Sequence, residues 1–167
     1  PKITSGGITY PYIYRTNTLP SELKRNPNTI RFRNPPAENC PDGRMPLFYT
    51  PNYEELRKEI QKANGKLILV EGISDVWAWY SANVLNVVGL ISGGTPVDEE
   101  LVMQFKELGV KTIDFYPDLD NTGFDVAHKV AKLIEKSKIT LKAWGLPFYA
   151  PNGNVVKDSR DLWNGCN

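Results

Sequence analysis

The sequence has few of the residues that build zinc sites and disulfide frameworks. Its 167 residues include one histidine and two cysteines, Cys40 and Cys166. Two cysteines so far apart do not form a zinc-binding spacing, and a single histidine does not complete a ligand set. We therefore expect two reduced thiols without a special role, and no zinc-ribbon module in this chain.

Long apolar runs are absent as well. No stretch approaches the roughly 18 apolar residues that span a bilayer, and no basic start with an apolar middle indicates a signal peptide. A hydrophobic content of 41% is enough for a packed core. These features predict a globular, soluble, cytoplasmic protein without a membrane partner. Because the chain begins at Pro1 rather than at Met, we expect a piece of a longer protein.

The net charge of +1 conceals an asymmetry along the chain. Residues 1–66 hold 11 Lys and Arg against 6 Asp and Glu, whereas residues 67–167 hold 9 against 13. A basic part beside an acidic cation site is the arrangement that phosphate binding needs. Chance clustering on a solvated surface explains the charge asymmetry equally well.

The first 64 residues are expected to form a small mixed basic lobe with a linking helix. Residues 1–51 are rich in Pro, Asn and Thr, with short β-like runs at 8–15 and 29–33 between turn signals. Apolar residues then recur at helical spacing from Tyr53 to Ala63, before an Asn-Gly stop signal. This helix would lead into a second domain at residues 65–167.

In that second domain, apolar strands alternate with amphipathic helices. The expected strands are 67–70, 86–91, 111–116 and 139–144, and the expected helices are 74–84, 97–108 and 124–136. The pattern predicts an α/β fold, with a parallel sheet, helices on both faces and right-handed crossovers. Turn residues at 152–154 predict a hairpin that carries residues 157–161 back towards the edge of the sheet.

Carboxylates follow two of the expected strands at the point where each strand ends. The run LILV leads into Glu71, and the run TIDFY leads, after a proline, into Asp118 and Asp120. In an extended segment, residues i and i+2 project to the same side, so both aspartates are expected to aim at one point. If the strands are neighbours, Glu71 lies at the same carboxyl edge, where ligands of open α/β sheets bind.

This acidic set predicts a site for Mg²⁺ or Mn²⁺, because hard cations prefer oxygen ligands. For Glu71, a carboxylate stabilised by a helix N-terminus is the alternative. Asp75 could be a further ligand, but a helix cap is the stronger interpretation.

Several other residues are candidates for contacts with phosphate or nucleic acid. Gly93 and Gly94 follow the second strand, although they could form only a loop. Asp158 is a candidate outer metal ligand or part of a solvated turn, and phosphate contacts are expected for Lys157 and Arg160. The basic lobe offers a strip of basic side chains that could bind a template or a nucleoside triphosphate, namely Lys24, Arg25, Arg31, Arg33 and Arg44. The alternative is that these residues are the solvated charges of an edge strand.

Together, these motifs resemble the Toprim signature of primases, topoisomerases and some nucleases. The segment LILVEGISD at 67–75 is followed by DLDNTG at 118–123 and by KDSRDL at 157–162. Within that superfamily, the order is most similar to primases of the bacterial and phage type. Asn121 departs from their pattern, because a basic residue often occupies that position.

The resemblance implies a Toprim domain that carries out metal-dependent nucleotidyl transfer, namely RNA primer synthesis on single-stranded DNA from nucleoside triphosphates. It makes Glu71, Asp118 and Asp120 catalytic and metal-binding residues, and it implies helicase or zinc-binding domains in a longer parent protein. A Toprim nuclease or strand-breaking enzyme is the alternative, as is a degenerate module that only binds DNA.

Overall fold

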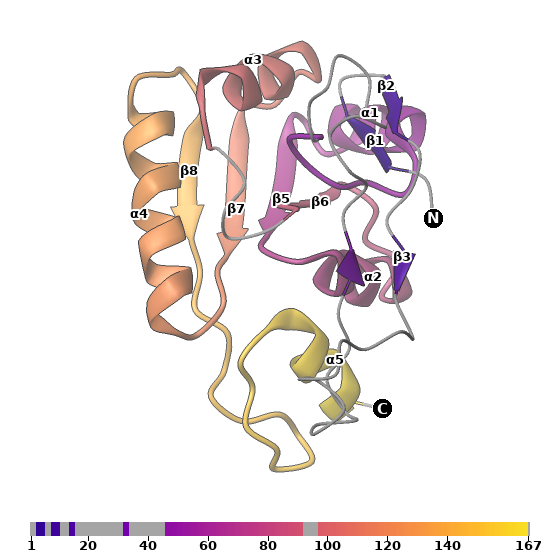
Figure 1. Ribbon diagram of the computed structural model, residues 1–167, viewed down its shortest axis with the longest axis vertical. Coiled ribbons are helices and arrows are strands. Elements are labelled where there is room, and N and C mark those ends of the chain that lie inside the picture. The colour runs from indigo at the N-terminus through magenta and orange to yellow at the C-terminus, as the bar shows by residue number, and fades with distance from the viewer. Residues whose placement is uncertain are drawn as a thin grey trace.

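The computed structural model describes residues 3–5, 8–10, 14–15, 32–33, 46–91 and 97–166 of the chain (Figure 1). Its N-terminal part contains two pairs of short antiparallel strands. Strand β1 (Ile3–Ser5) pairs with β2 (Ile8–Tyr10), and β3 (Tyr14–Arg15) pairs with β4 (Phe32–Arg33). Strands β2, β3 and β4 fall within the two β-like runs predicted from the sequence. The boundary after residue 64 stays a prediction.

The centre of the molecule is a four-stranded parallel sheet with the order β6-β5-β7-β8. Its strands are β5 (Lys66–Val70), β6 (Val87–Gly89), β7 (Thr112–Tyr116) and β8 (Thr140–Ala143). Strand β5 pairs in parallel with both β6 and β7, and β8 adds to the outer side of β7. The predicted α/β architecture is therefore confirmed.

Five helices lie around this sheet in the described part of the chain. They are α1 (Tyr53–Lys62), α2 (Ile73–Ser81), α3 (Glu99–Glu107), α4 (Asn121–Glu135) and α5 (Ser159–Cys166). The first four match predicted helices, but α5 was not predicted. The predicted hairpin is confirmed by an antiparallel bridge between Tyr149 and Val155. Within the part of the chain that the structure describes, no helix is long and apolar enough to cross a bilayer.

Alternating side chains of the strands divide the core into two layers. Leu67, Leu69 and Phe115 pack in one buried cluster with apolar residues of α1, α3 and α4. Ile68 and Val70 face the other way and pack with α2. Full burial of one such side chain stabilises the fold by about 1.5–3 kcal/mol. Helices therefore cover both faces, as the apolar strands predicted.

The linking helix α1 has the boundaries that its sequence signals predicted. The side chain of Asn52 caps its N-terminus by accepting a hydrogen bond from the Glu55 amide at 3.2 Å. After the helix, Asn64 and Gly65 adopt positive φ angles of 56° and 86°, a conformation that suits Asn and Gly at helix ends. Because α1 packs into the core cluster of the sheet, it stabilises the second domain directly.

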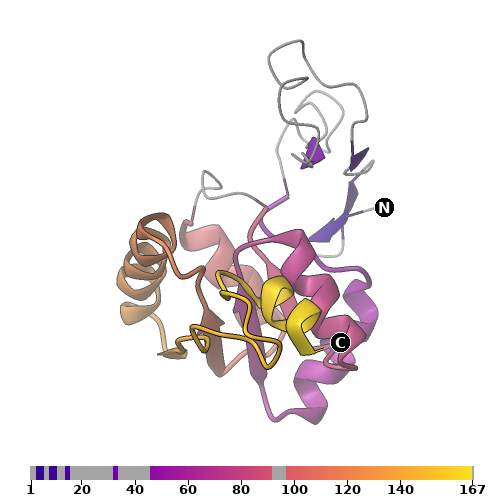
Figure 2. The same ribbon diagram turned by 90° about the horizontal axis from the view of Figure 1, so that it is seen from below.

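The C-terminal segment, residues 146–166, lies against the α2 side of the molecule. Figure 2 shows α5 beside α2. The indole of Trp79 on α2 donates a hydrogen bond to the Ser159 hydroxyl of α5 at 3.2 Å. The Leu119 amide donates to the carbonyl of Lys157 at 2.8 Å. This segment thus reaches the loop that follows β7.

Candidate metal and nucleotide site

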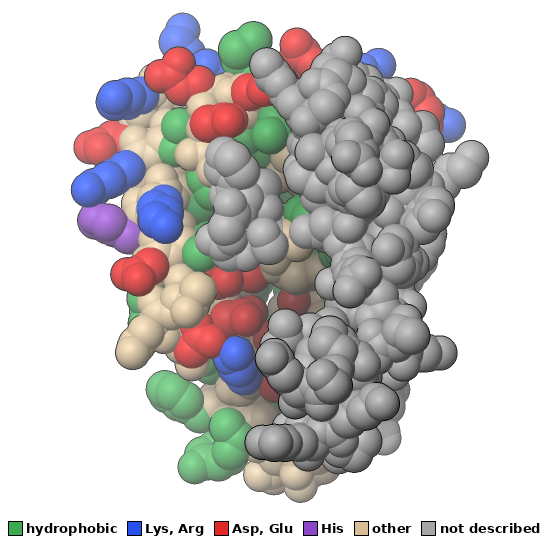
Figure 3. All heavy atoms as spheres, in the orientation of Figure 1, with side chains coloured by type: hydrophobic (Ala, Val, Ile, Leu, Met, Phe, Trp, Pro, Cys, Tyr) green, Lys and Arg blue, Asp and Glu red, His purple; other side chains and the backbone are tan. Residues whose placement is uncertain are grey.

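The carboxyl ends of β5 and β7 meet at one edge of the sheet. Val70 and Tyr116, the last residues of these strands, are paired in the parallel register. Glu71 follows the first strand directly, and Asp118 and Asp120 follow the second. Acidic side chains gather on the surface at this edge (Figure 3). The two acidic loops therefore lie at the same edge of the sheet, as predicted.

Glu71 joins the two strand ends. Its Oε1 accepts a hydrogen bond from the Asp118 backbone N–H at 2.9 Å. Burial raises the pKa of the Glu71 carboxyl, this hydrogen bond lowers it, and the nearby Asp120 charge raises it further. Gly123 leaves room for this contact, because a Cβ atom there would lie 2.7 Å from Glu71 Oε1. Glu71 therefore positions the Asp118 loop.

Asp118 carries the most strongly perturbed carboxyl of the site. Burial raises its pKa to about 7, and the charges of Glu71, Asp75 and Asp158 contribute in the same direction. Lys157 opposes the shift. A carboxylate that repels its neighbours in this way gains the most from a bound cation. Such perturbed groups gather at functional sites.

Asp120 is held differently, as the N-cap of α4. Its Oδ1 accepts a hydrogen bond from the Gly123 amide at 2.8 Å, and its Oδ2 lies 2.9 Å from the ammonium of Lys157. The ion pair and the cap lower the pKa of this carboxyl. Asp118 and Asp120 therefore have opposite electrostatic environments, although one residue separates them.

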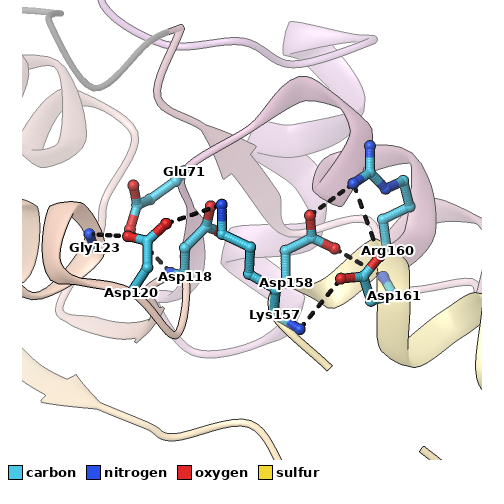
Figure 4. Close-up of polar contacts among 8 residues, drawn as sticks. All are labelled: Glu71, Asp118, Asp120, Gly123, Lys157, Asp158, Arg160 and Asp161. Atoms are coloured by element: carbon cyan, nitrogen blue, oxygen red, sulfur yellow. Dashed lines mark hydrogen bonds and ion pairs between the residues drawn. The ribbon is translucent and has the colours of Figure 1, made fainter. Parts of the chain in front are cut away.

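The C-terminal segment brings further charges to this edge, as the hairpin predicted. The side chain of Lys157 lies between the carboxylates of Glu71 and Asp120 on one side and Asp158 on the other (Figure 4). Asp158 accepts hydrogen bonds from the Asp161 amide at 2.7 Å and from the Arg160 guanidinium at 2.9 Å. Asp158 is thereby the cap of α5. Its role as an outer metal ligand stays a prediction.

Asp75 is a larger part of this site than its sequence indicated. It is 4% exposed on α2, and its Oδ1 accepts a hydrogen bond from the Arg160 amide at 3.1 Å. Burial raises its pKa to about 6, with Asp158 adding to the shift. The signal in the sequence that could have indicated this role was a carboxylate within the largely apolar helix ISDVWAWY. Asp75 thus anchors the start of α5, whereas the N-cap residue of α2 is Gly72 and not the predicted Asp75.

The two raised carboxyl groups predict a pH dependence of stability. Asp75 and Asp118 ionise near pH 6 and pH 7 in the folded protein, but near 3.8 when unperturbed. Their contribution to the free energy of unfolding is fully present below about pH 4 and is lost as the pH rises through the folded values. We expect the Tm in EDTA to fall between pH 5 and about pH 8. The double variant Asp75→Asn/Asp118→Asn should flatten this dependence in thermal melts, and an equally steep curve would contradict the assignment.

The donor atoms at this edge suit Mg²⁺ or Mn²⁺, because all of them are carboxylate oxygens. In the part of the chain that the structure describes, however, no three acidic, histidine or cysteine side chains are arranged to hold a metal ion. Asp120 turns towards Gly123 and Lys157 instead of sharing one point with Asp118. The Lys157 ammonium supplies the positive charge in this arrangement. Metal binding by Glu71, Asp118 and Asp120 stays a prediction.

Other predicted contacts fall largely outside the described residues. Arg33 lies in β4, where only the course of the backbone is described. The remaining predicted contacts outside the description are Lys24, Arg25, Arg31, Arg44, Gly93 and Gly94. The roles of all seven residues stay predictions.

Comparison with solved structures finds the same fold in bacterial primases. A DnaG primase catalytic domain bound to single-stranded DNA matches 87% of this chain, with a TM-score of 0.57 and 19% identity. The Escherichia coli primase catalytic core matches 89%, with a TM-score of 0.55 and 19% identity. A DNA primase domain from Pseudomonas aeruginosa matches 65%, with a TM-score of 0.51 and 23% identity. The chain spans 42%, 41% and 32% of these structures, respectively.

Comparison by sequence identifies the family. A search among curated proteins finds no match. The model of the Toprim-like family matches residues 68–157, which is more than half of the chain. The matched segment includes Glu71, Asp118 and Asp120. The chain therefore belongs to the Toprim-like family.

Proposed function

We propose that this chain is the catalytic part of a DNA primase that joins ribonucleotides on a single-stranded DNA template. The observation that carries the proposal is the carboxylate cluster at the ends of β5 and β7, in a fold shared with primase catalytic cores. One of those cores was solved with single-stranded DNA bound to it. Nucleotidyl transfer needs a site of this kind, because its substrates are polyanions.

Within this site, Asp118 and Asp120 would hold Mg²⁺ or Mn²⁺, and Glu71 would ligate the metal or act as the base. When bound, the metal neutralises triphosphate charge and lowers the pKa of the attacking 3′-hydroxyl. Glu71 fixes the Asp118 loop through the 2.9 Å hydrogen bond to its amide. Asp118 would be the first carboxylate to gain from the metal, because burial, together with the charges of its neighbours, raises its pKa to about 7.

Lys157 has two partners in this proposal. It pairs with Asp120 at 2.9 Å, and its side chain is 54% exposed. With Asp120 engaged in holding the metal, the Lys157 ammonium would be free beside the site to contact a phosphate oxygen of the nucleotide. Arg160 is placed for a second phosphate contact from the start of α5, next to Asp158. The side chains of Lys157 and Arg160 would then bind the substrate instead of neutralising the carboxylates of the acidic loops.

The template and triphosphates would also contact the basic residues that precede the sheet, Lys24, Arg25, Arg31, Arg33 and Arg44. The glycines Gly93 and Gly94 would offer backbone amides to phosphate. Since the chain spans less than half of the matched primase structures, helicase or zinc-binding domains in a longer parent protein remain part of the proposal.

The proposal is tested with radiolabelled nucleoside triphosphates, single-stranded templates, and either Mg²⁺ or Mn²⁺. We expect short RNA products that grow with time and disappear when EDTA is added. The template should keep its length. A shortened template without new products would instead assign a Toprim nuclease. If the chain binds DNA but neither synthesises RNA nor shortens the template with Mg²⁺ or with Mn²⁺, it is a module that only binds DNA.

A further inference from the structure

A second charged surface lies away from the acidic edge, in the groove between α3 and α4. This α3–α4 groove has a volume of about 470 Å³. Its rim carries four lysines, namely Lys106 from the last turn of α3, Lys129 and Lys132 from the C-terminal half of α4, and Lys136 at the C-cap of α4. Figure 3 shows basic side chains, interspersed with acidic ones, over α4 and hydrophobic ones exposed between α4 and α3. Lys132 lies about 18 Å along α4 from Asp120, at 1.5 Å per residue.

The lysines of this groove outnumber the acidic side chains that line it. None of the four forms an ion pair with another residue that the structure describes. Glu99 is the one acidic side chain that lines the groove within the described ranges. Lys129, Lys132 and Lys136 follow one another at helical spacings of three and four residues, so they form one row on α4. The lining of the groove therefore carries four lysines against one glutamate.

Between the two helices, the groove is apolar. Val102, Met103 and Leu133 line it, and the side chain of Met103 is 58% exposed. Methionine is flexible and polarisable, and it adapts to varied apolar partners. Met103 and the four lysines together give the groove an apolar centre and a basic rim.

We propose that the α3–α4 groove binds a short, acidic, amphipathic segment of a partner protein. Carboxylates of the segment would meet the lysine rows, and its apolar side chains would contact Met103 and Leu133, as in other helix-in-groove interfaces. Nucleic acid fits less well. The groove is lined by no aromatic residue for base stacking and by no arginine, within the described part of the chain. This binding is independent of primer synthesis, because the groove shares no residue with the acidic edge.

The test uses a fluorescent peptide of glutamates with a leucine at every third or fourth position, titrated with the full chain in low salt. We expect saturable binding. The double variant Lys129→Glu/Lys132→Glu should weaken it about tenfold, since each exposed ion pair contributes modestly. Met103→Ser should weaken it about fivefold through lost apolar contact.

Matched controls separate the groove from general charge attraction. Lys58→Glu changes an exposed lysine on α1 outside the groove and should leave peptide binding unchanged. A peptide with serines in place of the leucines should bind at least about fivefold more weakly. Equal binding of both peptides, or equal weakening by Lys58→Glu, would overturn the proposal. Tighter binding of a single-stranded oligonucleotide, lost in the groove variant, would also overturn it in favour of a nucleic-acid surface.

Discussion

Asp118→Asn is expected to reduce metal-dependent primer synthesis about a thousandfold, since a metal ligand supplies several kcal/mol of charge stabilisation in the transition state. The same substitution should stabilise the metal-free protein at pH 8. The Asp118 carboxyl, with a pKa of about 7, is ionised there against the charges of Glu71, Asp75 and Asp158, and an amide removes this repulsion. Primer assays and thermal melts in EDTA measure the two effects.

Two companion variants sharpen this result. Asp120→Asn should also lose synthesis but hold its Tm within about 2 °C, because an asparagine still caps α4 and an exposed ion pair contributes at most about 1 kcal/mol. Asp125→Asn, an exposed position on the same helix, should retain activity. If Asp118→Asn kept full synthesis, or lowered the Tm at pH 8, Asp118 would be structural rather than catalytic.

Gly123→Ala is expected to be strongly destabilising, although it adds one methyl group. The new Cβ would clash with the Asp118 carbonyl oxygen and lie 2.7 Å from Glu71 Oε1. Overpacking of this kind costs about 1–3 kcal/mol, which corresponds to a fall in Tm of roughly 3–10 °C for a chain of this size. Because backbone is one of the clashing partners, rotation of a side chain does not relieve the strain. Thermal melts by circular dichroism provide the measurement.

Gly145→Ala is the matched control, since a Cβ atom at Gly145 meets no atom within 4 Å. It should change the Tm by less than about 2 °C. If Gly123→Ala melted like this control, the close approach of α4 to the two strand ends would be wrong. Activity of the Gly123 variant, measured well below its Tm, should also fall, because Glu71 would be displaced from the Asp118 amide.

The sheet and its first four helices were predictable because their apolar residues follow clear periods. β5 and β7 are short runs of buried residues, and α4 is amphipathic over 15 residues. Helix α5 was missed because its eight residues follow a turn-rich segment and mix polar with apolar side chains. A cap signal was present, since Asp158 precedes Asp161 by three residues and accepts a hydrogen bond from its amide.

The carboxylates of the site were predictable, but their partners were not. Glu71, Asp118 and Asp120 sit at strand ends that the sequence marks plainly. The turn residues at 152–154 predicted that residues 157–161 return to the edge of the sheet, but no local pattern specifies that Lys157 pairs with Asp120. The hydrogen bond from Arg160 to Asp75 joins residues 85 positions apart, so only the tertiary fold reveals it. The local pattern therefore predicted where the acids lie, but not which of them are neutralised.

If Asp120 binds a divalent cation as proposed, the C-terminal segment links its own attachment to the cation affinity of the site. Lys157 is paired with Asp120 at 2.9 Å, so the cation would compete with an ammonium group that the chain itself supplies. Detachment would leave Glu71, Asp118 and Asp120 without that positive charge, and they would attract the ion more strongly. By reciprocity, an ion bound at Asp120 would loosen this end of the segment to the same degree in free energy. The segment that packs against α2 would then also set the cation concentration at which the site fills.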